Sequence, residues 1–153
     1  MSAWTDSEQA FMRLALAEAA LAAGKGEIPV GAVVVKNGKV IGRGHNLSIV
    51  NADPTAHAEV GALRSAALEL KNYRLSGAEL YVTLEPCAMC VGAMLHARIS
   101  RLVFGAYDAK AGAAGSVLDL ADSRAFNHRI EVNGGLLQED CGAMLQEFFA
   151  SRR

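Results

Sequence analysis

The chain has 153 residues, of which 52% are hydrophobic and 20% are charged. This length is typical of one domain and short for two, so we expect a single domain over residues 1–153. The high hydrophobic content excludes long-range disorder. The formal net charge of −1 excludes a general electrostatic attraction to nucleic acid, so an RNA partner would have to be bound by a local patch and by pockets.

The apolar segments predict neither a membrane span nor an export signal. The run at residues 14–23 is interrupted by Glu18 and is too short to cross a bilayer. The first residues lack the basic-then-apolar order of a signal peptide. The odd number of cysteines does not suit a secreted disulfide scaffold. We therefore expect a soluble, cytoplasmic protein without a membrane partner.

The first third of the chain predicts a helix followed by a β-hairpin. Apolar residues recur at helical spacing over residues 8–23, and Asp6 and Ser7 are the expected N-terminal cap. Two β-branched runs, at residues 30–35 and 40–44, flank Asn37-Gly38, which is the strongest short signal for a hairpin turn.

The rest of the chain predicts helices alternating with strands. The expected elements are a helix at 58–70, a strand at 79–84, a helix at 87–97, a strand at 102–104, a glycine- and alanine-rich loop at 105–116, a strand at 130–132 and a helix at 139–149. This order predicts an α/β fold with three α/β/α layers and a mixed sheet.

Two segments carry metal-competent side chains at the starts of predicted helices. Residues 54–59 read PTAHAE and residues 84–90 read LEPCAMC. Cys87 and Cys90 are three positions apart and therefore neighbours on a helix, and His57 would supply a third ligand. Three protein ligands leave a fourth tetrahedral position for water, which is the pattern of a catalytic rather than a structural zinc site.

Glu59 is the expected proton carrier of this site. It follows His57 by two positions, and at the first turn of a helix both side chains can project past the helix end. A carboxylate beside a zinc-bound water can take its proton and deliver it elsewhere.

Each motif alone has a simpler interpretation. A lone histidine at a helix start is usually a cap or a surface residue, and Cys-x-x-Cys can be a redox pair, although Glu85-Pro86 does not supply a thioredoxin-like context. Together, His-x-Glu and Pro-Cys-x-x-Cys match the known signature of zinc-dependent nucleobase deaminases. The roles of the other metal-competent residues stay open: His45, His96, His128 and Cys141.

Beyond this signature, the chain resembles the bacterial tRNA-specific adenosine deaminases of the cytidine-deaminase-like zinc hydrolase superfamily. The matching stretches are EIPVGAV at 27–33, DPTAHAE at 53–59, NYRL at 72–75, LYVTLEPC at 80–87, DAK at 108–110, NHR at 127–129 and FF at 148–149.

The resemblance implies a cytidine-deaminase-like sandwich with a five-stranded mixed sheet, one Zn²⁺ per subunit and a homodimer. The apolar helix around residues 89–95 independently favours packing of two copies. The implied reaction is the hydrolytic deamination of adenosine to inosine at the wobble position of a tRNA anticodon, in which zinc-bound hydroxide attacks adenine C6 and Glu59 shuttles the protons. The residues implied to contact the nucleoside or the anticodon stem-loop are Asn46, Asp108, Lys110, Phe149 and Arg153.

Two other functions remain open at the level of sequence. A deaminase of a free base or nucleoside (cytosine, guanine or adenosine) would have the same metal site, whereas residues 108–110 and the aromatic pair at 148–149 favour a macromolecular substrate. A non-catalytic, zinc-stabilised interaction module is the second alternative. Glu59 and the missing fourth ligand argue against that module.

Overall fold

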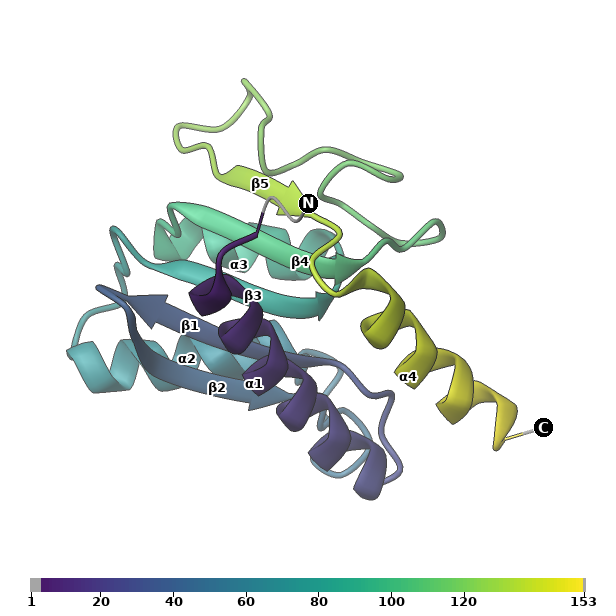
Figure 1. Cartoon of the computed structure of the whole chain (residues 1–153). Helices are drawn as coiled ribbons and strands as arrows, with labels where there is room; N and C mark the ends of the chain where they lie inside the picture. The colour runs from purple at the N-terminus through teal and green to yellow at the C-terminus, as the bar shows by residue number, and fades with distance from the viewer. Residues whose placement is uncertain (1–3, 153) are drawn as a thin grey trace.

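A five-stranded sheet forms the middle layer of the protein, with helices on both of its faces (Figure 1). The computed structural model describes residues 4–152. The spatial order of the strands is β2-β1-β3-β4-β5. Their bounds are β1 (Gly31–Lys36), β2 (Lys39–His45), β3 (Glu79–Leu84), β4 (Arg101–Ala106) and β5 (Glu131–Gly134). The predicted α/β/α architecture and the five-stranded mixed sheet are confirmed.

Strand direction changes twice across the sheet, between β2 and β1 and again between β1 and β3. β1 runs antiparallel to β2 and β3, whereas β3, β4 and β5 are parallel to one another. Leu84 at the end of β3 pairs with Ala106 at the end of β4. The segments that follow these two strands therefore leave the sheet side by side at the same edge. Both segments carry residues that the sequence analysis singled out.

The helices pack in pairs on opposite faces of the sheet (Figure 1). One face is covered by α1 (Asp6–Gly24) and α4 (Gln138–Ala150), and the other by α2 (Ala58–Leu70) and α3 (Ala88–Ala97). Because successive strand residues point to opposite faces, Ala32 and Val34 pack in one core and Val33 and Val35 in the other. Among residues 4–152, no helix is both long and apolar enough to span a membrane.

The predicted hairpin turn is confirmed. Asn37 and Gly38 both have positive φ values, 52° and 75°, as a type I′ turn requires. Lys36 and Lys39 are paired on either side of it. The backbone twist of this turn matches that of the two flanking strands.

Three helices begin at other residues than predicted, and for α4 the difference is one residue, because it begins at Gln138. The N-cap of α1 is Thr5 rather than Asp6 or Ser7. The Thr5 hydroxyl accepts a 3.0 Å hydrogen bond from Glu8 N, and the Glu8 carboxylate accepts a 2.8 Å bond from Thr5 N. This reciprocal pair satisfies two backbone donors at the start of the helix. Helix α3 begins at Ala88, so Cys87 is its N-cap.

Glycines in β2 allow α2 to lie directly on the sheet. A Cβ atom at Gly42 would stand 2.4 Å from Ala62 O, and one at Gly44 would stand 2.3 Å from Ala58 O. No larger residue fits at such distances without moving the helix backbone. Gly44 thereby determines how closely the first turn of α2, which follows His57, approaches the sheet.

Candidate active site

The three predicted metal ligands lie together at the starts of two helices. His57 is the N-cap of α2, Cys87 is the N-cap of α3, and Cys90 is buried in the first turn of α3. The Nδ1 atom of His57 lies 3.6 Å from the Cys87 Sγ atom and 3.5 Å from the Cys90 Sγ atom. The three ligand atoms all lie within 4.8 Å of one another, so these residues could hold a metal ion.

The donor set and its spacing fit zinc. In a tetrahedral site with usual Zn–S and Zn–N bond lengths, a nitrogen and a sulfur ligand stand about 3.6 Å apart. The two nitrogen–sulfur distances agree with this value. Two thiolates and one imidazole are also ligands that zinc prefers.

The hydrogen bonds at the start of α2 explain the orientation of the His57 ring. The carbonyl of His57 accepts the first helical hydrogen bond of α2, from Gly61 N at 3.0 Å, but its imidazole does not cap the helix. The Asn46 side-chain oxygen instead accepts a 3.0 Å bond from Ala58 N. Because Asn46 satisfies this backbone donor, the His57 ring is free to face the two sulfur atoms.

Glu59 is a buried carboxylate beside the cluster. It is the second residue of α2 and only 4% exposed. Burial raises the pKa of Glu59 to about 7, and the nearby Cys87 adds to the increase while His57 opposes it. A carboxyl group with a pKa near neutrality can both take up and release a proton at physiological pH.

The two cysteines have opposite acidities. A hydrogen bond from Cys90 lowers the pKa of Cys87 to about 5, with His57 contributing in the same direction. The same bond, together with burial, raises the pKa of Cys90. The cluster therefore already contains one thiolate near neutral pH, and metal binding requires one further thiol proton to leave.

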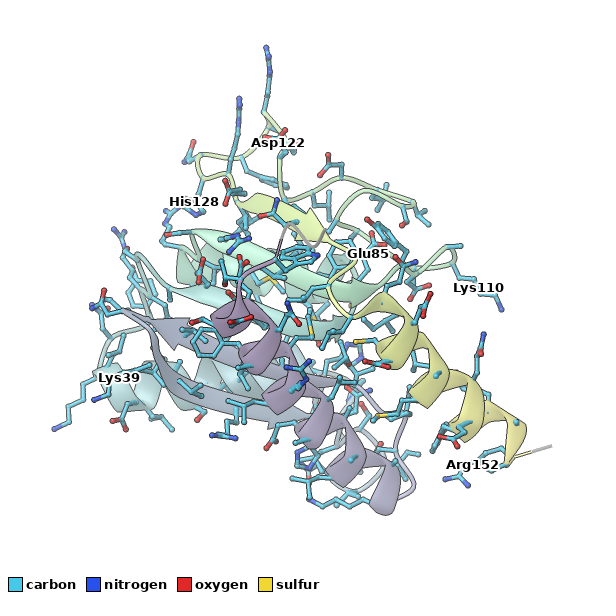
Figure 2. All side chains as sticks on the ribbon, viewed as in Figure 1. Lys39, Glu85, Lys110, Asp122, His128 and Arg152 are labelled. Carbon is cyan, nitrogen blue, oxygen red and sulfur yellow. The ribbon has the colours of Figure 1, made fainter. Side chains whose placement is uncertain are left out.

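The residues implied to bind substrate come from separate elements. Asp108 and Lys110 lie in the loop after β4, where Asp108 Oδ1 accepts hydrogen bonds from Lys110 N at 3.0 Å and Ala111 N at 3.1 Å. Figure 2 shows Lys110 and Arg152 on the same side of the molecule, away from Lys39. Arg153 lies outside the described residues.

Phe149 and Asn46 differ in their surroundings. Phe149 is exposed near the end of α4, in edge-to-face contact with Phe148 at 5.6 Å, and the Arg152 guanidinium lies 4.2 Å above the Phe148 ring. Asn46 has both side-chain groups engaged, because its nitrogen also donates to Ile28 O at 3.1 Å. Its visible role is to hold the start of α2.

The histidines and the cysteine left open by the sequence lie outside the three-ligand group. His45 contacts Glu18 at 2.9 Å and Lys25 at 3.0 Å, and His128 Nε2 bonds to Ile99 O at 2.7 Å. His96 is exposed in the last turn of α3. Cys141 is buried in α4.

Sequence reasoning missed two buried carboxylates that hold loops at the site. Glu27 accepts hydrogen bonds from Ile49 N at 3.2 Å and Val50 N at 2.8 Å. Glu85 accepts bonds from the loop after β4. The sequence did carry a signal for both residues, since each glutamate stands beside apolar residues and near a proline, a context that indicates burial. A buried carboxylate needs several hydrogen-bond donors, so it is expected to hold other segments of the chain.

Comparison with known proteins agrees with this geometry. The MafB19-like deaminase family matches residues 6–153. A tRNA-specific adenosine deaminase of Haemophilus influenzae is 53% identical over 97% of this chain and 87% of its own.

Two solved structures share the fold. One comes from work on A-to-I editing by tRNA:A34 deaminases at the wobble position; its TM-score is 0.86 at 44% identity, covering 89% of this chain and 99% of that one. The other, a guanine deaminase from Nitrosomonas europaea, has a TM-score of 0.79 at 27% identity, covering 93% of this chain and 84% of that one. This chain therefore belongs to the MafB19-like deaminase family and, within its nearer relatives, to the tRNA-specific adenosine deaminases.

Proposed function

We propose that this protein converts adenosine to inosine at the wobble position of a tRNA anticodon by hydrolytic deamination. The observation that carries the proposal is the buried Glu59 carboxylate beside a His57, Cys87 and Cys90 cluster of zinc-like spacing. The named activity of the Haemophilus influenzae relative and of the tRNA:A34 deaminases supports the choice of substrate.

His57, Cys87 and Cys90 would hold one Zn²⁺ per subunit. A bound zinc ion lowers the pKa of a coordinated water to about 7 and so makes a nucleophile available near neutral pH. The N-terminus of α3, which carries both cysteines, favours their thiolate form, because the positive end of the helix dipole stabilises negative charge.

Glu59 would move the protons of the reaction. Its carboxylate takes one proton from the attacking water and delivers it to adenine N1. A second transfer brings the remaining water proton to the exocyclic amine. The C6–N6 bond then breaks, ammonia leaves, and the water oxygen remains on C6 as the carbonyl of inosine. Burial of Glu59 suits this role, because its raised pKa lets it accept and donate within one cycle.

The RNA contacts are proposed for residues of the loop after β4, of the C-terminal segment and of the segment after β2, among which Lys110 and Phe149 are exposed. Lys110 offers a positive charge to a phosphate, and Asp108 can accept a hydrogen bond from a base or ribose. Phe149 and Arg153 would extend the contact, since an exposed aromatic ring can stack on an unpaired base. Asn46 would contact the target nucleoside while holding the start of α2.

A homodimer would cover the exposed apolar surface of α2 and α3. Leu68 in α2 is 79% exposed, and Tyr73, in the segment after α2, is 67% exposed. A groove of about 340 Å³, lined in part by Val60, Ala93 and Tyr73, runs between the two helices. Apolar side chains at such a site lower the free energy when a second copy covers them. We place this single-domain enzyme in the cytoplasm, where its RNA substrate would be available.

The test is a substrate panel. The protein is incubated separately with an anticodon stem-loop carrying adenosine at the wobble position, free adenosine, free guanine and free cytidine, and products and ammonia are quantified. Inosine in the stem-loop, with little turnover of the small molecules, supports the proposal. Guanine is included because a guanine deaminase shares the fold. Turnover of a free base or nucleoside alone would establish the alternative function.

A further inference from the structure

Glu85 connects the metal cluster to the loop after β4. It lies directly beyond the end of β3, two residues before Cys87, and is 2% exposed. Its backbone N donates a 2.8 Å bond to Ala106 O, which extends the β3–β4 pairing by one step. Figure 2 shows Glu85 on the same side of the molecule as Lys110.

The loop folds around the Glu85 carboxylate. Backbone N–H groups donate to it from Asp108 at 3.1 Å, Ala114 at 3.1 Å and Ser116 at 3.0 Å, and the Ser116 hydroxyl donates as well. Gly112 permits this approach, because a Cβ atom there would stand 2.4 Å from Glu85 Cδ. One side chain therefore organises donors that are spread over nine positions of the loop.

Most other hydrogen bonds of the loop close turns within it, such as those from Gly112 N to Asp108 O at 3.0 Å and from Val117 N to Gly112 O at 2.9 Å. Ala113 N donates to Pro86 O at 2.8 Å, and Ala114 forms an isolated bridge with Asp119. Hydrogen bonds to a carboxylate are stronger than neutral ones, and a fully bonded buried network rigidifies its surroundings. Together with the β3–β4 pairing, Glu85 therefore ties Asp108 to the segment that carries Cys87.

We propose that Glu85 is a positioning residue that pre-arranges the loop bearing Asp108 and Lys110 for binding the anticodon loop. This inference rests on the proposed function. A loop that is already ordered loses less entropy on binding than a mobile one. Glu85 thus acts on the affinity for RNA, while the chemical step depends on Glu59 and the metal ligands.

Glu85→Gln tests the proposal with almost no change in volume. The new amide nitrogen faces backbone donors, so at least one loop hydrogen bond is lost. KM for the stem-loop should rise about tenfold or more, kcat should stay within about threefold, and zinc content should be unchanged. Hydrogen exchange of the amides at Asp108, Ala114 and Ser116 should accelerate.

Glu79→Gln is the matched control. It makes the same substitution at the other end of β3, where the carboxylate faces Arg101 at 3.2 Å. Its KM and the exchange of the loop amides should equal those of the wild type.

A double-mutant cycle with Asp108→Ala shows whether Glu85 acts through the loop. If it does, adding Glu85→Gln to Asp108→Ala should raise KM by a smaller factor than Glu85→Gln does in the wild type, because one of the contacts that Glu85 positions is already absent. If Glu85→Gln does not fold, Ser116→Ala, which removes only the hydroxyl donor to Glu85, replaces it in the double-mutant cycle. Ser116→Ala should raise KM less than the increase expected for Glu85→Gln, and it should leave kcat unchanged.

The results that would overturn the inference are distinct. They are a wild-type KM in Glu85→Gln, a loss of kcat at constant KM, or KM effects that multiply in full with those of Asp108→Ala. If the wild-type protein makes no inosine from the stem-loop, the proposed function fails instead. The exchange measurement still decides whether Glu85 orders the loop.

Discussion

His57 Nδ1 and Cys90 Sγ stand 3.5 Å apart, although 33 positions separate the two residues in the chain. Each belongs to the N-terminal end of a different helix, and these helices, α2 and α3, pack against each other on one face of the sheet. The contact joins two sequence motifs into one cluster. The cluster is the basis for the first prediction.

Loss of either cluster cysteine should remove the metal. The wild-type protein should carry about one zinc per chain, and Cys87→Ala or Cys90→Ala should retain little zinc and little activity, because two protein ligands bind zinc far more weakly than three. Metal content by plasma mass spectrometry checks this. Cys141→Ala is the control, since Cys141 is buried elsewhere in α4 and should leave the zinc in place. Full zinc occupancy in both cluster variants would show that the ligands are misassigned.

Replacement of Glu59 should separate metal binding from chemistry. Glu59→Ala and Glu59→Gln should fold, retain zinc and bind the anticodon stem-loop about as well as the wild type. Their deamination rate should fall by roughly a hundredfold to ten-thousandfold, the usual effect of losing general acid–base catalysis. Loss of zinc from Glu59→Ala would make Glu59 a ligand, and a near-normal rate would assign the proton transfer to another group.

Cysteine reactivity in the zinc-stripped protein should follow the cysteine pKa values. The pKa of Cys87 is lowered to about 5, so its thiolate predominates above that pH and alkylation by iodoacetamide should already be fast at pH 6.5. Burial raises the pKa of Cys141 to about 12, so this thiol should remain unmodified. Peptide mass spectrometry over pH 4–9 gives the midpoint. A midpoint near the ordinary thiol value of about 8.5 would contradict the prediction, and added zinc should protect Cys87.

A methyl group at Gly44 should disturb the start of α2. The Cβ atom would stand 2.3 Å from Ala58 O and 2.5 Å from Ala62 N, both backbone atoms. We expect Gly44→Ala to lower the free energy of unfolding by about 1–3 kcal/mol and to weaken zinc binding through displacement of His57. Gly142→Ala, in α4 with nothing within 4 Å of its Cβ position, should instead stabilise the protein by about 0.5–1 kcal/mol. Urea unfolding of both variants compares these effects.

A charge on the α2 surface should break the proposed dimer. Light scattering at micromolar concentration should give the mass of two chains for the wild type and of one chain for Leu68→Glu, because a carboxylate cannot be buried there without a partner. Leu21→Glu is the control, since Leu21 is exposed on α1 at the opposite face of the sheet. A monomeric wild type would refute the dimer.

The sequence by itself determined the elements whose signals are local. The helix at 58–70 and the strand at 79–84 have the predicted bounds, because each shows strong periodicity between clear breaks. The Asn37-Gly38 turn is equally local, since positive φ values suit these two residues. The candidate metal-binding residues were also identifiable, because few residue types bind zinc and their spacing is distinctive.

Only the tertiary structure decided which polar side chains are buried and which loops they hold. Glu85 meets donors more than twenty residues away, and Asn46 caps a helix that begins twelve residues later. No local pattern marks such pairs, because they depend on parallel strands ending at one edge and on how closely α2 lies on β2. The raised pKa of Glu59 has the same origin. Its burial follows from the packing of α2 against the sheet and α3, which residues 57–59 do not specify alone.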